Sequence, residues 1–160
     1  MNQTETLRVA KKAVAVDLTL AGGQPRHVEI FLAEHRANEF RRQDVLDLLE
    51  NANAFLPVRA AGSPDQEIFN KDALLWIGVP LAHFGSEEDS PEELFEFRRP
   101  VRVELLGTAA LDGDLLYSAR EESTRVVDYL NETGRFLRLW AKDRLYLINK
   151  TFVLRIVETI

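Results

Sequence analysis

The sequence contains one pattern twice, and this internal repeat restricts the fold more than any other feature. Three segments of the first half recur in the same order in the second half. The matched segments are residues 14–18 and 101–105 (VAVDL and VRVEL), 45–55 and 126–136 (VLDLLENANAF and VVDYLNETGRF), and 69–71 and 148–150 (FNK and INK). Their separations are 87, 81 and 79 residues, a steady decrease that fits shorter loops in the second copy. A repeat of this kind is typical of a duplicated supersecondary unit.

The repeat predicts a tandem duplication with a linker between the copies. The first copy spans residues 10–80, the linker 81–99 and the second copy 100–160. The linker region is acidic, because residues 81–100 hold six acidic and two basic side chains. Ser90-Pro91-Glu92-Glu93 has the form of a capping box with proline in the first turn, which predicts a short helix through Phe97.

Each copy is predicted to be a ββαββ unit, so the fold class is α+β. Val14, Val16 and Leu18 alternate with small or polar residues, which is the period of a half-buried strand. Apolar residues at positions 45, 48, 49 and 52 have helical spacing. The predicted strand segments are 14–20, 27–33, 55–59, 67–70 and 73–79, then 101–105, 113–118, 136–140, 145–149 and 152–157. We expect each copy to form a small barrel or a strongly bent antiparallel sheet, with the helix covering one end and the last two segments forming a hairpin.

The alternation also predicts a core and an interface. The residues expected to be buried are Val16, Leu18, Ile30, Leu49, Phe55 and Ile77, with their counterparts Val103, Leu105, Leu115, Leu130, Phe136 and Ile156. A unit of about 60 residues buries only about 60% of its unfolded surface and is marginal alone. The two copies are therefore expected to share an interface around a pseudo-two-fold axis, as homodimers do.

Composition excludes several classes of protein. The chain has no cysteine, so disulfides, thiol chemistry and cysteine-ligated metals are excluded. Twenty basic and twenty-six acidic residues give a net charge of −6, which disfavours binding to nucleic acid or an anionic membrane. No segment has the length of a membrane span or the form of a secretory signal, so a cytoplasmic protein is the default expectation.

Catalytic and metal-binding motifs are weak in this sequence. It has no G-x-S-x-G motif, and Gly22-Gly23 lacks the context of a phosphate-binding loop. The set closest to a metal or acid–base cluster is His27, Glu29, Glu34 and His35, but histidine and glutamate are also common on the solvent face of a strand. The sequence therefore predicts no enzyme, no metal and no cofactor.

An Asn-Lys pair occurs at the same place in both copies, as Asn70-Lys71 and Asn149-Lys150. Asparagine tolerates positive φ, and a two-residue hairpin turn requires it. The pairs therefore predict a tight turn, and contact with a ligand is the alternative.

Arginines and aromatic residues gather in the last three strand segments of the second copy. They are Arg135, Arg138, Trp140, Arg144, Tyr146 and Arg155. Arginine interleaved with aromatic rings is typical of single-stranded nucleic-acid binding. The alternatives are a solvated sheet face or a protein interface, where Trp and Arg are frequent hot-spot residues.

Strand alternation predicts which of these side chains point outward. Leu56 and Val58 are expected inward, as are Leu137, Leu139, Leu75, Ile77, Leu154 and Ile156. The outward residues, which we take as candidate binding residues together with the two Asn-Lys pairs, are Arg59, Trp76, Arg138, Trp140 and Arg155. Exposed tryptophan is seldom left bare. Trp76 or Trp140 is therefore predicted to lie in a contact surface, either between the copies or with a partner chain.

Each half resembles the Sm-like fold, a small, strongly bent five-stranded barrel. Residues 148–156 have the spacing of that family's I-R-G-x-x-V-x-x-I segment, and residues 69–77 repeat the spacing. The resemblance implies a barrel-like unit and, by extension, an RNA-binding module. Asn149-Lys150 and Asn70-Lys71 stand where the family has the Arg-Gly pair that helps to line its RNA site, and a helix interrupts each unit.

Three functions follow from these observations. The first is a non-catalytic protein-protein interaction or adaptor protein with an unidentified protein partner, supported by the doubled unit, the acidic linker and the weak catalytic motifs. The second is an RNA-binding Sm-like module. The third is a small-molecule sensor with its site between the copies.

Overall fold

The structure is a computed structural model that describes residues 11–33, 45–84, 95–107, 110–118 and 125–159. Glu34 and His35, two of the metal candidates, lie outside these residues, as do residues 85–94, where most of the linker helix is predicted. Phe97, the predicted last residue of that helix, instead begins a strand, because it pairs with Tyr117.

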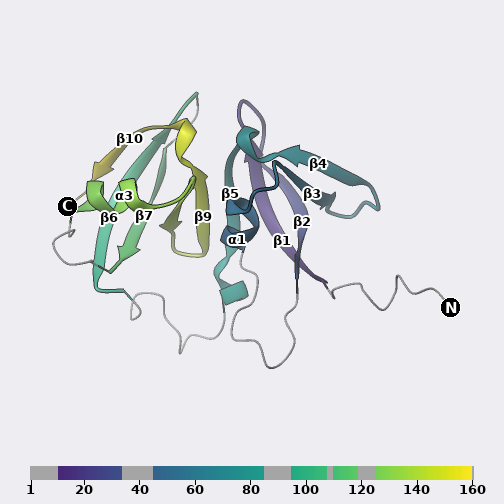
Figure 1. Ribbon diagram of the computed structural model, residues 1–160, viewed down its shortest axis with the longest axis horizontal. Helices are drawn as coiled ribbons and strands as arrows, with labels where there is room; N and C mark the ends of the chain where they lie inside the picture. The colour runs from purple at the N-terminus through teal and green to yellow at the C-terminus, as the bar shows by residue number, and fades with distance from the viewer. Residues whose placement is uncertain (1–10, 34–44, 85–94, 108–109, 119–124, 160) are drawn as a thin grey trace.

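The first repeat contains β1 Lys11–Leu20, β2 Arg26–Ala33, α1 Val45–Glu50, β3 Phe55–Ala60, β4 Gln66–Asn70, η1 Lys71–Ala73, β5 Leu74–Pro80 and η2 Leu81–Phe84. The second contains β6 Phe97–Leu105, β7 Leu111–Tyr117, α3 Val126–Glu132, β8 Phe136–Trp140, β9 Arg144–Asn149, η4 Lys150–Phe152 and β10 Val153–Glu158. Figure 1 shows the two repeats as two neighbouring lobes.

The described strands form one ten-stranded antiparallel sheet in the order β10-β6-β7-β8-β9-β5-β1-β2-β3-β4. In both repeats the fifth strand lies beside the first, followed by the second, third and fourth. The prediction that the copies share one strand order is therefore confirmed. Over the described residues the sheet is open rather than closed into a barrel, with β10 and β4 as its outer strands.

Each repeat has five strands, at the five strand segments predicted for it, so the ββαββ formula counted one strand too few. The prediction that the last two strand segments of each copy form a hairpin is wrong. β4 pairs with β3, whereas β5 pairs with β1 on the other side of the repeat. The short 3-10 turn η1 moves the chain from one side to the other, and η4 has the same position in the second repeat.

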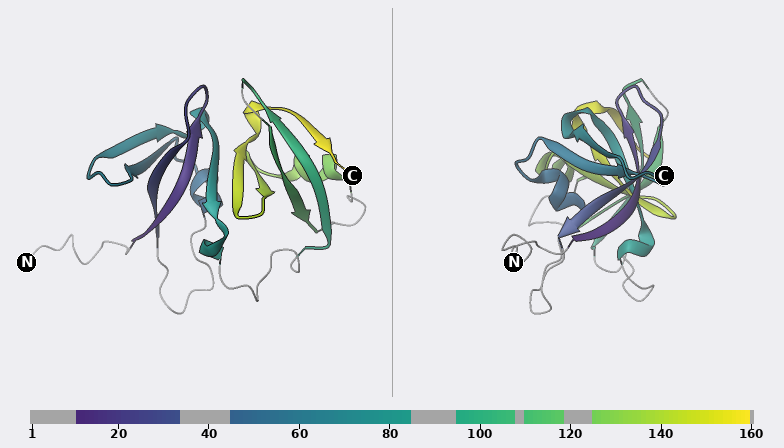
Figure 2. Two further views of the ribbon diagram at one scale, coloured as in Figure 1. Left: turned by 180° about the vertical axis from the view of Figure 1, so that it is seen from behind. Right: turned by 90° about the vertical axis from the view of Figure 1, so that its right-hand side faces the viewer.

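In each repeat, the second and third strands are paired over very few residues. β2 and β3 share only the pairs Val28↔Ala60 and Glu29↔Arg59, and β7 and β8 share only Asp114↔Trp140. Pro57 lies beyond the β2 pairing and faces Ile68 of β4, so its missing N–H costs no bond to β2. The five strands of each repeat form one lobe (Figure 2).

Glycine is required at one of these short pairings. A Cβ on Gly113 would lie 2.7 Å from the carbonyl oxygen of Trp140. β7 and β8 can therefore approach closely only because residue 113 has no side chain.

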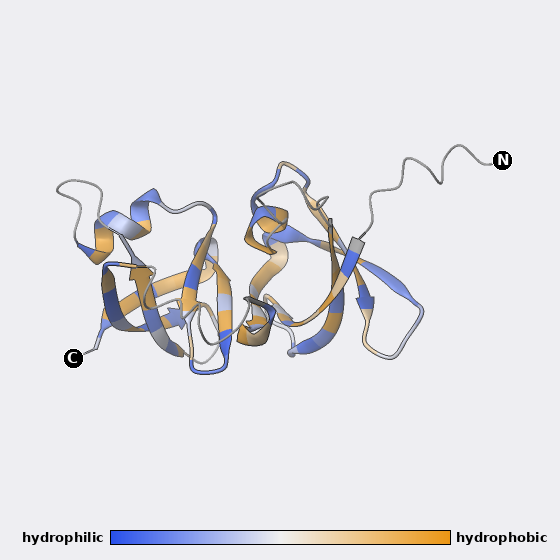
Figure 3. Ribbon diagram, turned by 90° about the horizontal axis from the view of Figure 1, so that it is seen from below, coloured by the Kyte–Doolittle hydropathy of each residue, from blue (hydrophilic) through white to orange (hydrophobic). Residues whose placement is uncertain are grey.

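Two clusters of buried apolar side chains form the core, and apolar and polar residues alternate along the strands (Figure 3). Most predicted core residues are buried, among them Leu18 and Ile30 at 0% exposure. Leu130 and Ile156 are only half-buried, and Phe55 is 59% exposed, so these three predictions are wrong in part or whole. Phe55 is out of phase with Leu56 on β3 and points away from its own core.

The two helices are short and depend on the sheet. α1 has six residues and buries Val45 and Leu49, and α3 has seven residues and buries Val126. Helices of this length are unstable in isolation. No described helix is long and apolar enough to span a membrane.

Candidate protein–protein interface

The inner junction is the place where the two repeats meet, and β5 and β9 form it. They pair over five residues, from Trp76↔Ile148 to Pro80↔Arg144. A two-fold axis would also pair β10 with β4, but these strands lie at opposite ends of the sheet. The predicted pseudo-two-fold arrangement is therefore wrong. The junction is heterologous, because it joins the fifth strand of one repeat to the fourth strand of the other.

Apolar side chains cross the inner junction in both directions. Phe136, Leu145 and Leu147 of the second repeat belong to the first core cluster and are 2%, 3% and 1% exposed. Leu75 of the first repeat belongs to the second cluster and is 1% exposed. The hairpin of β8 and β9 is thus apolar on both faces, with one face in its own core and the other in the core of its neighbour.

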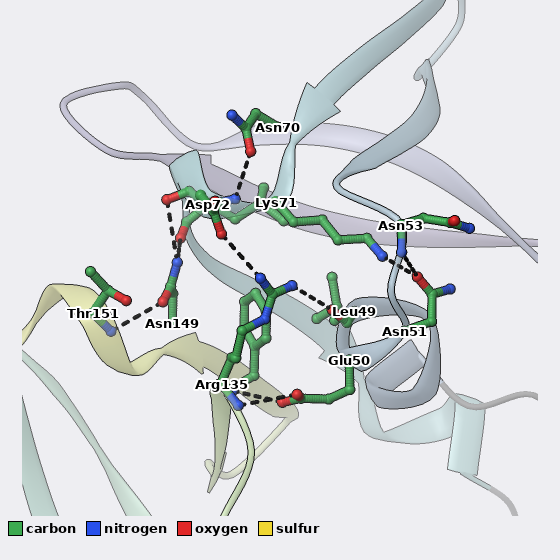
Figure 4. A network of polar contacts seen from close by, with 12 residues as sticks. Leu49, Glu50, Asn51, Asn53, Asn70, Lys71, Asp72, Arg135, Asn149 and Thr151 are labelled. Atoms are coloured by element: carbon green, nitrogen blue, oxygen red, sulfur yellow. Dashed lines mark hydrogen bonds and ion pairs between the residues drawn. The ribbon is translucent and has the colours of Figure 1, made fainter.

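Glu50 and Arg135 form the polar part of the junction (Figure 4). The Glu50 carboxylate, at the end of α1, accepts hydrogen bonds from the backbone N–H groups of Arg135 at 3.1 Å and Phe136 at 2.8 Å. The Arg135 guanidinium donates to Asp72 Oδ1 at 3.1 Å and to the Leu49 carbonyl at 3.2 Å. These contacts connect α1 and η1 of the first repeat to the start of β8.

Gly134 makes room for this contact. A Cβ at residue 134 would lie 2.5 Å from the Glu50 carboxylate oxygen. A side chain here would displace the Glu50 carboxylate from the position in which it accepts its two backbone hydrogen bonds.

Asn149 and Arg144 fix the two ends of the β5–β9 pairing. The Asn149 side chain is 4% exposed and donates to the Leu74 carbonyl at 2.9 Å. At the other end, Arg144 forms an ion pair with Asp17 of β1 at 2.5 Å. The hydrogen bond to Asp17 raises the pKa of Arg144 above its ordinary value. Both contacts join residues of different repeats, so they stabilise the junction rather than either repeat alone.

Both tryptophans are half-buried at or beside the inner junction. Trp76 pairs with Ile148, and its ring meets Tyr146 edge to face at 5.2 Å. Trp140 packs against the first core cluster, although it belongs to the second repeat. These positions agree with the expectation that a tryptophan lies in a surface between the copies.

The outer edges of the sheet expose the counterparts of the junction residues. Ile68 on β4 is 66% exposed, whereas its counterpart Leu147 is 1% exposed. Leu154 on β10 is 65% exposed, whereas its counterpart Leu75 is 1% exposed. The inward orientation predicted for Leu154 is therefore wrong. Over the described residues, no strand covers β10 or β4 on the outer side.

Phe55 adds a third exposed apolar side chain to the β4 edge. It lies on β3 opposite Asn70, and its counterpart Phe136 is buried at the inner junction. Phe55, Ile68 and Leu154 together are named here the outer-edge residues. One feature of the sequence points to the outer-edge residues. Two consecutive apolar residues, such as Ile68-Phe69, place apolar side chains on both faces of a strand.

The Asn-Lys pairs have local partners in both repeats. Asn70 and Asn149 are the N-caps of η1 and η4, with φ of −74° and −68°, so the tight turn is a 3-10 turn and not the positive-φ turn predicted. Lys71 is 1% exposed and donates to the Leu48 carbonyl and to Asn51 Oδ1, both at 2.6 Å. Burial lowers the pKa of Lys71.

Lys150 plays the same part in the second repeat. Its ammonium donates to the carbonyls of Leu130 at 2.7 Å and Thr133 at 3.0 Å. Each lysine therefore holds the C-terminal end of its repeat's helix, where cations are favourable.

Most candidate arginines have carboxylate partners. Arg59 pairs with Glu29 at 3.0 Å and lies over the Phe31 ring at 5.1 Å, and Arg155 forms a two-bond ion pair with Glu104. Arg138 is half-buried on β8 and forms no ion pair with a described residue. The arginine-aromatic cluster is thus divided between the inner junction and the exposed faces of the sheet.

The structure also locates the metal candidates and a surface groove. His27 lies on the exposed side of β2 and contacts Asp17, and Glu29 is paired with Arg59. Within the described residues, no three His, Cys, Asp or Glu side chains form a group that could hold a metal ion. A groove of about 720 Å³ lies mainly on the second repeat, near Arg98, Asp112 and Trp140, and Leu81 of η2 lines it from the first repeat.

The geometry therefore defines a class of interface: a heterologous pairing of sheet edges, made once inside the chain. Comparison with known proteins adds no family, because no family model, curated protein or solved structure matches the chain.

Proposed function

We propose that this chain is a non-catalytic interaction protein that binds another protein at its open sheet edges. One observation carries this proposal: Phe55, Ile68 and Leu154 are 59%, 66% and 65% exposed, while their counterparts in the other repeat are buried by strand pairing. Phe55 and Ile68 lie together at the β4 edge and Leu154 lies at the β10 edge, and exposed apolar side chains at such a surface are typical of interaction sites.

The backbone of the outer strands supports the same proposal. An edge strand presents unpaired N–H and C=O groups that can accept a further strand. Proteins use such edges for recognition, in which backbone hydrogen bonds supply affinity and side-chain pockets supply specificity. Neither edge is protected by an outward lysine or by a proline within the strand, since β4 is QEIFN and β10 is VLRIVE.

The charges favour a protein partner over RNA. Arg144, Arg155 and Arg59 are all paired with carboxylates. Lys71 and Lys150 donate to backbone carbonyls. Phosphate binding requires cations that can neutralise the nucleic-acid backbone, and these five have other partners.

The repeat arrangement supports a finer description of the fold. We infer that each half is one copy of a duplicated, strongly bent sheet similar to the Sm-like fold. Support comes from the identical strand order of the halves and from the narrow β2–β3 and β7–β8 pairings, at which a sheet can bend.

Photo-crosslinking in the native host tests the proposed function. A photoreactive amino acid replaces Ile68 or Leu154, and a third variant has it at Ala15, which is exposed on β1, a strand that pairs with β2 and β5 inside the sheet. We expect protein adducts at Ile68 and Leu154 that are absent at Ala15. Adducts at neither edge would contradict the proposal.

A further inference from the structure

We propose that the partner of each outer edge is a second copy of this chain, with β10 of one copy pairing with β4 of the next. This inference rests on the proposed function and names its partner. The inner junction already joins a fifth strand to a fourth strand, as β5 with β9. Each chain retains one unused strand of each kind, β10 and β4, at opposite ends of the sheet.

The repeat spacing fixes the register of the outer joint. In the inner junction Ile77 pairs with Leu147. Adding the spacing of 79 residues to Ile77 gives Ile156, and subtracting it from Leu147 gives Ile68. Ile156 of one copy therefore lies opposite Ile68 of the next, and antiparallel pairing continues along both strands.

The side chains at the outer edges match those that the inner junction buries. Leu75 is buried in the core of the second repeat, and Leu154 would enter the first repeat of the next copy in the same way. Ile68 and Phe55 would occupy the places that Leu147 and Phe136 have at the inner junction. In the outer joint, each of the three outer-edge residues would therefore be buried in the core of the neighbouring copy.

One polar contact of the inner junction can form again in the outer joint. Asn149 donates to the Leu74 carbonyl. Its counterpart Asn70 would donate to Val153, the counterpart of Leu74, in the neighbouring copy.

Other contacts of the inner junction have no equivalent, and their loss makes the outer joint weaker. Ala54 stands at the place of Arg135, and Asn131 at the place of Glu50. The Arg144–Asp17 ion pair is replaced by Asp65 facing Arg102, because Val157↔Arg102 corresponds to Gly78↔Asp17, and Arg102 is already paired with Asp112. The inner junction is permanent because the chain is continuous, whereas the outer joint is reversible and depends on protein concentration.

The symmetry of the joint predicts how the assembly grows. A heterologous contact leaves one free edge of each kind after every addition, so it forms a closed ring if the rotation between copies closes, and otherwise a filament. The assembly therefore does not end at two copies joined by a single contact.

Sedimentation equilibrium of the purified chain tests the inference, with three lysine variants. I68K blocks the β4 edge, L154K blocks the β10 edge, and A15K places the same charge on the exposed face of β1, which pairs with β2 and β5 inside the sheet, as a control. All three positions are exposed, so the variants are expected to fold, which their denaturant midpoints check. Wild type and A15K should associate as concentration rises, and I68K and L154K should each associate at least about tenfold more weakly.

Mixing the two blocked variants gives the sharpest result. I68K retains the β10 edge and L154K retains the β4 edge, so an equal mixture should form a 1:1 heterodimer that stops growing. A wild type that stays monomeric at every concentration would overturn the self-assembly, as would blocked variants that fail to complement each other. If the wild type is monomeric but Ile68 and Leu154 crosslink to a different protein in the host, the proposed function stands and only the identity of the partner is wrong.

Discussion

Phe55 and Phe136 occupy equivalent positions in the two repeats, yet their side chains are 59% and 2% exposed. The difference comes from their neighbours. α1 and β5 of the first repeat cover Phe136, and within the described part of the chain no equivalent elements follow β4 to cover Phe55. Burial of this position is thus set by the adjoining repeat and not by the repeat that contains it.

Alanine substitution at these two positions should therefore have unequal effects. F136A removes a buried ring from the inner junction and should lower the free energy of unfolding by about 3–5 kcal/mol. F55A removes an exposed ring and should change it by less than about 0.5 kcal/mol in the dilute chain. Urea denaturation measures both, and equal losses would show that the two positions are buried alike.

Lys71 predicts a dependence of stability on pH. Burial lowers the pKa of its ammonium group in the folded chain, whereas in the unfolded chain the pKa stays near about 10.4. Between these two values the unfolded state binds more protons, so the free energy of unfolding rises with pH across that window. The neutral amine still has two N–H groups for the Leu48 carbonyl and Asn51.

The comparison variant for this prediction is K71M, which cannot titrate. The stability of the wild type relative to K71M should increase as the pH is raised toward about 10.4. Denaturant midpoints measured from neutral to alkaline pH provide the values. A constant or falling difference would contradict the lowered pKa.

At the scale of elements, the Glu50 carboxylate connects the end of α1 to the start of β8. Glu50 accepts two backbone hydrogen bonds from the second repeat, at 2.8 and 3.1 Å. E50A leaves both donors without this acceptor and should cost about 1–3 kcal/mol. The matched control is N131A, the counterpart position on α3, which is exposed and should cost less than about 0.5 kcal/mol.

Hydrogen exchange shows whether the loss is located at the junction. In E50A the amides of β8 and β9 should exchange faster, while those of β6 should change little. Uniform acceleration in all strands would indicate that Glu50 acts on global stability and not on the contact between α1 and β8.

The sequence predicted the elements well and their pairing less well. The alternation around Val14 and the helical spacing around Leu49 are local, so strand and helix segments could be placed within a few residues. Spacing alone cannot show which strand lies beside which. Residues 69–77 fit a hairpin, but Asn70 caps a 3-10 turn and β5 crosses to β1 instead.

Because the sequence does not show which strands are neighbours, the site residues could be predicted only in part. Trp76 was predicted outward at a contact surface, and it lies at the inner junction beside Tyr146. Leu154 was predicted inward from alternation, yet it is exposed, because the core it fits belongs to another repeat. Glu50 gave no signal, since a single acidic residue at the end of a helix has no distinctive pattern.

At the scale of the whole molecule, the heterologous junction determines which strand edges remain open. A pseudo-two-fold pair of repeats would also have paired β10 with β4 and left neither edge open. The observed junction uses one edge from each repeat and leaves one edge of each kind at the ends of the sheet. The central claim is that the buried inner junction and the exposed outer edges are two instances of the same interface.

Disulfide formation between chains tests this claim most directly, because the sequence has no cysteine of its own. Residues directly opposite in antiparallel strands have Cα atoms about 4.5–5.5 Å apart, which suits a disulfide. I68C chains mixed with I156C chains should form disulfide-linked heterodimers under mild oxidation. Two comparisons accompany them: I77C/L147C in one chain, the inner counterpart, and A15C mixed with I156C, since Ala15 is exposed on β1 inside the sheet.

We expect rapid crosslinking in the I68C and I156C mixture and within I77C/L147C, and slow crosslinking in the A15C mixture. If the I68C and I156C chains crosslink no faster than the A15C and I156C chains, while I77C/L147C closes as expected, the outer edges do not repeat the inner junction.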